Sequence, residues 1–170
     1  MARTEYISPT SISQFHDSEK DIAWTHSDDA ISKTTYAVSA EPLHTIPGLW
    51  QEIYASRTNQ LICTGFNFNL VGTGVQGIEV QVGSIRLARI QDYIIQLTLN
   101  GELIGDNLAD GNIQDLKIFG SNSSLWGTNL TIDNINDPTF GIVVAFRSHV
   151  SIPHRDLIYV DQIAMRITYA

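Results

Sequence analysis

The feature that most constrains the fold is an alternation of apolar and polar side chains that recurs from residue 61 onward. Successive side chains of a β-strand point to opposite faces, so a period of two predicts strands with one buried face. Separate runs occupy residues 66–70, 78–82, 85–90, 95–99, 140–146 and 158–169. Short strands separated by turn signals are typical of antiparallel sandwiches, so we predict an all-β, antiparallel β-sandwich with jelly-roll-like or immunoglobulin-like connections.

Two local signals refine this prediction. Asn100-Gly101 supplies the two positive-φ residues of a type I′ turn and predicts a hairpin between 95–99 and 103–104. In the last run, the apolar residues of 158–160 and 163–169 have opposite parity, which predicts a β-bulge near Asp161-Gln162. No segment predicts a helix longer than about two turns, and the weak pattern in 106–118 is interrupted by Gly111 and Asn112.

The composition of the chain changes near residue 48, because all 12 glycines lie at Gly48 or later. Residues 1–47 show no regular period, and we predict an extended, irregular N-terminal arm there and a sandwich domain over 48–170. The arm carries too many large apolar groups for a solvated tail, so it must bury them against its own core or a neighbouring chain. The predicted assembly contacts of the arm are Tyr6, Ile7, Ile12, Phe15, Trp24 and Tyr36.

Charge and composition argue against several classes of partner. The 170 residues include 10 Lys and Arg against 18 Asp and Glu, a net charge of −8, whereas binding to a nucleic-acid backbone requires clustered cations. We see neither a secretory signal nor a membrane span, so we expect no membrane partner and synthesis in a cytoplasm. The single cysteine, Cys63, excludes a disulfide framework and a thiolate metal cluster.

The sequence gives no reason to predict catalysis, a cofactor or a metal. The five histidines lack metal-ligand spacing, and His149, His154 and Asp156 fit a polar loop tip better than a catalytic cluster. The oxygen-rich segment 105–115 lacks the spacing of a calcium loop, because Lys117 stands where the last carboxylate is needed.

One cluster of aromatic and polar residues could form a ligand-binding surface. Trp126 lies among polar side chains that include Asn122 and Asn129, and an exposed indole is a common platform for sugar rings. The favoured interpretation is that Trp126 is buried and plugs the end of the sandwich, and a ligand surface is the alternative. These three residues are the candidate ligand surface of a carbohydrate-binding module.

Several short motifs occur in order between residues 23 and 169. They include Ala23-Trp24, Gly65-Phe66, Gly77-Ile78-Glu79-Val80, Asn100-Gly101, Leu125-Trp126-Gly127, Ile135-Asn136 and Val160-Asp161-Gln162-Ile163. Their order and spacing resemble a β-sandwich module of structural proteins from tailed bacteriophages.

This resemblance implies a non-enzymatic virion component that is synthesised in the host cytoplasm. Without a tail-fibre or adhesin region beside it, a capsid decoration (cement) protein is the favoured role, and a tail or neck appendage or a carbohydrate-binding module for host attachment is the alternative. The implied partners are further copies of the chain, with a trimer favoured, and other virion proteins such as the major capsid protein.

Overall fold

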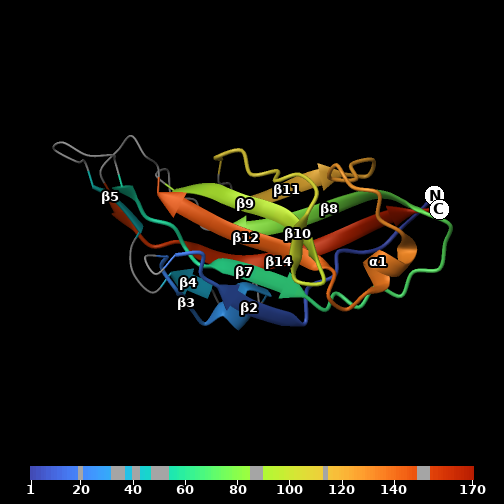
Figure 1. Cartoon of the computed structure of the whole chain (residues 1–170), viewed down its shortest axis with the longest axis horizontal. Helices are drawn as coiled ribbons and strands as arrows, with labels where there is room; N and C mark the ends of the chain where they lie inside the picture. The colour runs from blue at the N-terminus through green and yellow to red at the C-terminus, as the bar shows by residue number, and fades with distance from the viewer. Residues whose placement is uncertain are drawn as a thin grey trace.

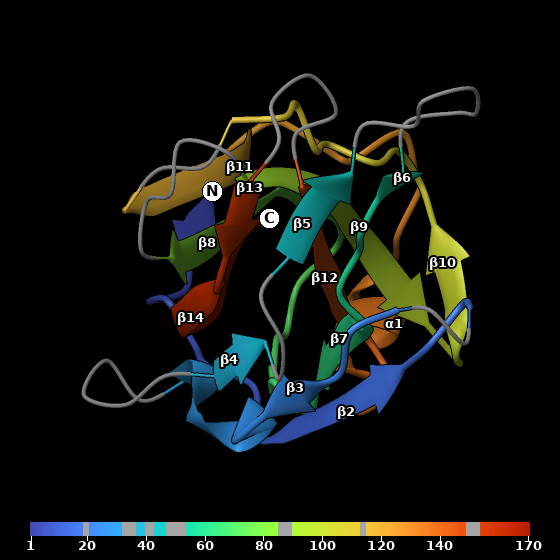
Figure 2. The ribbon, with the colours of Figure 1, turned by 90° about the vertical axis from the view of Figure 1, so that its left-hand side faces the viewer.

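The protein consists of two antiparallel β-sheets packed face to face, which confirms the predicted all-β sandwich (Figures 1 and 2). The structure is a computed structural model that describes residues 1–18, 21–31, 37–39, 43–46, 54–84, 90–112, 115–148 and 154–170. A single main core of apolar side chains fills the space between the sheets.

The first sheet has six strands. Its order is β11 (Leu116–Ser121), β8 (Val75–Ser84), β14 (Tyr159–Tyr169), β4 (Ala37–Ser39) and β3 (Trp24–Thr25), and β1 (Ala2–Arg3) pairs with β14. Inward-facing residues of adjacent strands stand opposite each other, as Val80 does to Met165 of β14 and Phe119 of β11.

The second sheet has five strands. Its order is β10 (Glu102–Ile104), β9 (Ile90–Leu99), β12 (Gly141–Ser148), β7 (Gln60–Thr64) and β2 (Ser11–Phe15). The chain passes from one sheet to the other at most connections between residues 60 and 169, so the two sheets are bound together along their length.

Smaller elements complete the fold. A three-stranded sheet joins β13 (His154–Asp156), β5 (Leu43–Ile46) and β6 (Tyr54–Ala55) at the end of the molecule opposite the two termini (Figure 1). A 3-10 helix, η1, spans Ser27–Ile31, and the one short α-helix of the described residues, α1, spans Ile132–Asn136. The side chain of Thr131 caps α1 by accepting a hydrogen bond from the Asn134 backbone N–H.

Both local predictions are confirmed. Asn100 and Gly101 have φ values of 54° and 81°, and β9 and β10 pair across them with Leu99 opposite Glu102. The register of β14 against β8 shifts between Val160 and Gln162, which is the expected bulge.

The alternation in 66–70 predicts burial correctly but does not form a strand. Phe66, Phe68 and Leu70 are buried, although the segment pairs with no strand. Asn67 has φ of 53°, which breaks the extended conformation. The side chain of Asn136 instead replaces a strand partner, since it accepts from the Leu70 N–H and donates to the Leu70 carbonyl, both at 2.9 Å.

A separate N-terminal arm and jelly-roll connections are not confirmed. In the described part of residues 1–47, β1 pairs with β14 and β2 pairs with β7, so the segment contributes strands to both sheets. The glycine-poor composition therefore marks a segment that closes one side of the sandwich rather than one that projects from it.

Candidate functional site

A second apolar cluster lies on the outer face of the five-stranded sheet, separate from the main core. It consists of Ile94, Val143 and Ala145, with Ile62 and Tyr93 packed beside them. Strand pairing explains the arrangement, because Val143 of β12 stands opposite Ile62 of β7, and Ala145 stands opposite Ile94 of β9. This sheet therefore has apolar side chains on both faces.

A groove runs over this cluster, and we call it the outer groove. It has a volume of about 370 Å³ and is lined by Phe15, Asp17, Gln60, Ile62, Ile94, Thr98, Gly101, Glu102, Leu103 and Val143. Phe15 at the end of β2 and Leu103 on the β9–β10 hairpin come from opposite edges of the sheet, and their exposed fractions are 50% and 44%. An aliphatic floor between two exposed apolar residues can bury apolar groups of a partner.

The outer groove is acidic. Asp17 and Glu102 are exposed, and among the described residues that line the groove there is no Lys, Arg or His. Two arginines lie beside the apolar cluster without lining the groove, since the guanidinium groups of Arg57 and Arg147 are 5.4 and 5.3 Å from the centre of the Tyr93 ring. Arg57 is also paired with a buried carboxylate of Asp21, at 3.3 Å.

Among the six predicted arm contacts, Ile12, Phe15 and Trp24 lie in strands, and Ile7 forms a bridge to β14. Ile12 lies in β2 opposite Cys63 and packs against the main core. Ile7 exchanges two backbone hydrogen bonds of 2.8 Å with Met165. Trp24 is buried in its own chain, where its indole N–H donates to the Asn59 carbonyl at 2.8 Å, so it cannot contact another subunit in this fold.

Tyr6 and Phe15 occupy the surface, and Tyr36 lies outside the described residues. The Tyr6 ring is partly buried, and the guanidinium of Arg166 lies 4.3 Å from its centre. Arg166 also donates two hydrogen bonds of 3.0 Å to Glu79, which accepts a third from Arg3 at 2.6 Å. This cluster fastens the start of the chain to the six-stranded sheet. Phe15 remains the exposed member of the described arm contacts.

The candidate ligand surface lacks an accessible indole. Trp126 is buried, and its indole N–H donates to the Ile78 carbonyl at 3.0 Å. Asn122 and Asn129 are exposed on either side of it. The ring therefore plugs the sandwich, and stacking of a sugar on Trp126 is not possible in this structure.

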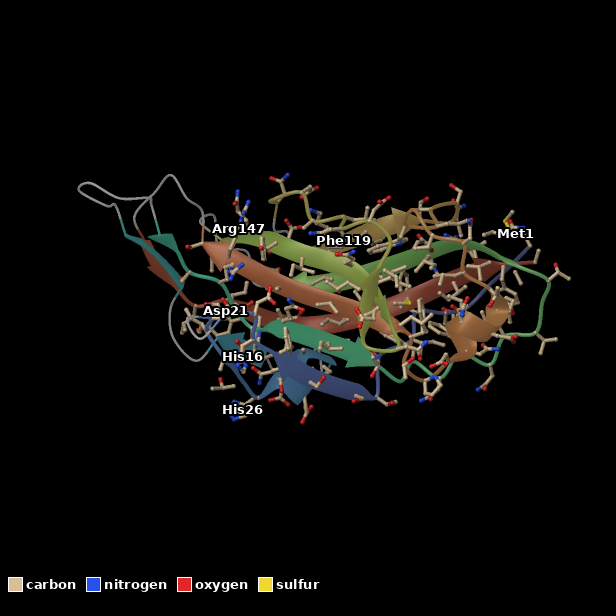
Figure 3. The ribbon with its side chains drawn as sticks, in the orientation of Figure 1. Met1, His16, Asp21, His26, Phe119 and Arg147 are labelled. Carbon is tan, nitrogen blue, oxygen red and sulfur yellow. The ribbon has the colours of Figure 1, made fainter. Side chains whose placement is uncertain are left out.

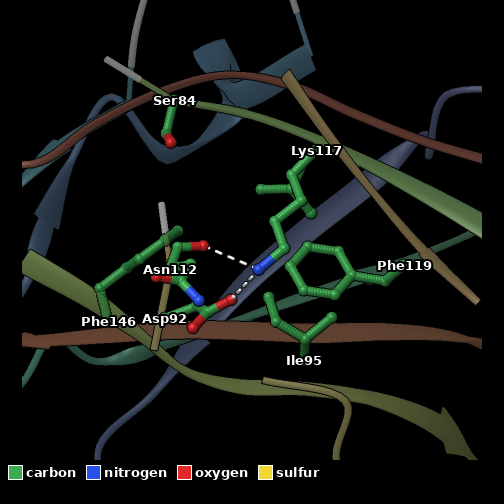
Figure 4. Close-up of a pocket in the computed structure, with 8 residues that line it drawn as sticks. Ser84, Asp92, Ile95, Asn112, Lys117, Phe119 and Phe146 are labelled. Carbon is green, nitrogen blue, oxygen red and sulfur yellow. Dashed lines mark hydrogen bonds and ion pairs between the residues drawn. The ribbon is translucent and has the colours of Figure 1, made fainter. Parts of the chain in front are cut away.

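A buried ion pair links the two sheets near β11 (Figure 4). The Lys117 ammonium donates to Asp92 Oδ2 at 3.2 Å, to the Asn112 carbonyl at 2.8 Å and to the Asp110 carboxylate, and it lies 4.6 Å from the centre of the Phe119 ring. An ammonium has three N–H donors, so Lys117 is fully satisfied. The adjacent cavity measures about 10 Å³, which is room for a single water molecule, so we assign this cluster a structural role.

The ionisation of this cluster follows from burial. Desolvation raises the pKa of Asp92, although Lys117 and the Gly111 N–H both favour its ionised form. The hydrogen bond from Lys117 lowers the pKa of the more exposed Asp110. Asp110 lies in the oxygen-rich segment 105–115 that was considered for calcium. Its carboxylate instead binds the Lys117 ammonium and fixes this loop to β11.

The described residues hold no cluster of metal-ligating side chains. No three His, Cys, Asp or Glu side chains gather there in a way that could hold a metal ion. Burial raises the pKa of the Cys63 thiol, which keeps it protonated. His149 and the side chains of His154 and Asp156 lie outside the described part of the chain. No helix of the described residues is long and apolar enough to span a membrane.

The two histidines whose side chains are described, His16 and His26, are exposed. Figure 3 places His16 and His26 on the N-terminal segment, at a distance from Met1 along the long axis of the molecule. His16 stacks on Phe15, with 6.2 Å between ring centres. It therefore lies beside the outer groove without lining it.

The sequence analysis missed the outer groove, although a signal for it exists. Residues 142–146 are five consecutive apolar residues, and Ile94-Ile95 and residues 61–63 also break the alternation. Continuous apolar strands are buried on both faces. These interruptions thus predict a sheet with a covered or partner-binding outer face.

No protein-family model, curated protein or solved structure matches this chain.

Proposed function

We propose that this protein is a non-enzymatic structural component of a tailed-phage virion, most simply a capsid decoration (cement) protein. In this proposal it self-associates and binds a neighbouring virion protein through the outer groove. The resemblance of residues 23–169 to phage sandwich modules motivates the virion role. The single observation that supports binding is the outer groove, in which exposed Phe15 and Leu103 flank an aliphatic floor.

The chemistry of the groove defines its partner. Ile62, Ile94 and Val143 suit aliphatic side chains better than hydroxyl-rich sugar rings. Asp17 and Glu102 add two carboxylates, so the fitting guest is an extended peptide segment with aliphatic and basic side chains. Burying the exposed halves of Phe15 and Leu103 would contribute about 1 kcal/mol each. The major capsid protein is the favoured source of such a segment, and a tail or neck protein is the alternative.

Binding to particles tests this proposal. The double variant Phe15→Ser/Leu103→Ser removes both flanking groups, and Val71→Ser is the matched control because Val71 is exposed but lies outside the groove. Purified protein is sedimented with particles that lack it, and circular dichroism verifies the fold of each variant. We expect the wild type and the control to pellet with particles and the double variant to remain in the supernatant.

The salt dependence of binding separates the contribution of the carboxylates from that of the apolar groove. If Asp17 and Glu102 contact basic side chains, the affinity falls as ionic strength rises. Equal pelleting of all three proteins would refute the role of the groove, and failure of the wild type to bind any particle would refute the virion role.

A further inference from the structure

The strand β11 forms an open edge of the six-stranded sheet (Figure 2). Within the described residues it pairs with β8 alone, and no strand lies against its second side. Such an edge presents backbone N–H and C=O groups that another strand can pair with.

This edge carries little of the usual protection against pairing. Edge strands commonly carry an outward charge, a proline or an inward-pointing charge, and β11 has only the last of these. The only charged residue of Leu116–Ser121 is Lys117, and its ammonium is already satisfied inside the sandwich by Asp92, Asp110 and Asn112. The outward-facing residues are Leu116 and Ile118, which are 49% and 50% exposed.

We propose that the β11 edges of two copies of this chain pair antiparallel about a two-fold axis and join their six-stranded sheets into one. The inference rests on the self-association in the proposed function and names the surface that carries it. Gly120 has φ of 76°, which disturbs the extended backbone, so the pairing involves Lys117–Phe119. A register centred on Ile118 places the two Ile118 side chains opposite each other and Lys117 opposite Phe119 of the second copy.

A second copy fits this edge better than a charged partner does. The outer groove presents two carboxylates and calls for basic groups, whereas β11 presents an uncharged apolar surface that is complementary to itself. The chosen register also keeps the two Lys117 residues from facing each other. An isologous contact closes as a dimer, so this inference replaces the trimer expected from the sequence with a two-fold pair.

Disulfide trapping tests the register. Ile118→Cys places two thiols opposite each other across the axis, at a separation that suits a disulfide. The native Cys63 is buried and does not compete. We expect Ile118→Cys to form a covalent dimer under mild oxidation, and Leu103→Cys, a similarly exposed position on the other sheet, to form no disulfide-linked dimer. Equal cross-linking of the two variants would contradict the pairing.

Solution mass tests the association itself. Light scattering should give twice the chain mass of 18.9 kDa for the wild type and the single-chain mass for Ile118→Lys or Leu116→Lys, each with unchanged circular dichroism. A monomeric or trimeric wild type would overturn the inference. The Phe15→Ser/Leu103→Ser variant should remain dimeric while losing particle binding, so failure at the edge and failure at the groove give different results.

Discussion

Replacing Lys117 with methionine tests the assignment of the buried ion pair as a structural tie. The side chains of Lys117 and Asp92 are only 12% and 2% exposed. Methionine keeps an unbranched apolar side chain at this position but removes the ammonium. The Asp92 carboxylate is then buried without its cation. Breaking a buried pair in this way costs about 3 to 5 kcal/mol. For a chain of this size, that corresponds to a fall of about 6 to 20 °C in the melting temperature.

The assay is urea unfolding followed by circular dichroism at pH 7, with the melting temperature as a second readout. Arg3→Met is the matched control, because Arg3 is 43% exposed and Glu79 keeps its bonds to Arg166 when Arg3 is removed. This control should lose no more than about 1 kcal/mol. The double variant Asp92→Asn/Lys117→Met should recover most of the loss.

The pH dependence of the same variant provides an internal check. Desolvation already raises the pKa of Asp92, so protonation of this carboxyl favours the folded state as pH falls. The deficit of Lys117→Met should therefore shrink in acid. A deficit below about 1 kcal/mol at pH 7, or one that does not change with pH, would refute the reasoning.

Three further predictions concern other parts of the fold. Trp24→Ala should lower the unfolding free energy by about 3 to 5 kcal/mol, measured by urea unfolding, because it empties a buried site and leaves the Asn59 carbonyl without its donor. Burial of Glu79 opposes its ionisation, but hydrogen bonds from Arg166 and Arg3 outweigh this effect and lower the pKa. The stabilisation by ionised Glu79 should therefore be complete above pH 4.5, the ordinary pKa of a glutamate, and should be lost as the pH falls below it. In melting temperatures measured over a pH series, Glu79→Gln should show a smaller decrease in acid than the wild type. Gly101→Ala should cost about 1 to 2 kcal/mol through backbone strain at φ of 81° alone, since no atom lies within 4 Å of the added methyl group, and an unchanged melting temperature would contradict this.

Local patterns in the sequence were sufficient for the sandwich itself. The alternation located β8, β9, β12 and β14, and Asn100-Gly101 located the hairpin, because each signal depends on neighbouring residues only. The pattern in 66–70 predicted which side chains are buried, but not that Asn136 would replace a strand partner. That replacement depends on a residue distant in sequence.

The buried ion pair and the outer groove could not be predicted from local sequence patterns. The segment that becomes β11 has Lys117 at an inward position, and its charge obscured the strand pattern. Its partner Asp92 comes from the opposite sheet, and no local rule pairs the two residues. Phe15 and Leu103 likewise flank one groove from opposite edges of a sheet whose strand order a single sequence does not reveal.

The N-terminal segment shows the same limit. Its apolar residues predicted burial, but the sequence left open whether the cover was its own core or another chain. Trp24 and Ile12 contact their own core, whereas Phe15 is left exposed at the outer groove. Among the described arm contacts, Phe15 is therefore the one on which the proposed assembly role now rests.

The most direct test of the virion role is mass spectrometry of density-purified particles released by cells that carry the gene. The account predicts that peptides of this chain co-purify with the major capsid protein at a fixed ratio across the particle peak. Chemical cross-links from the particles should join residues beside the outer groove to a basic segment of a neighbouring virion protein. Absence of the chain from particles, with its peptides confined to the soluble lysate, would contradict the account.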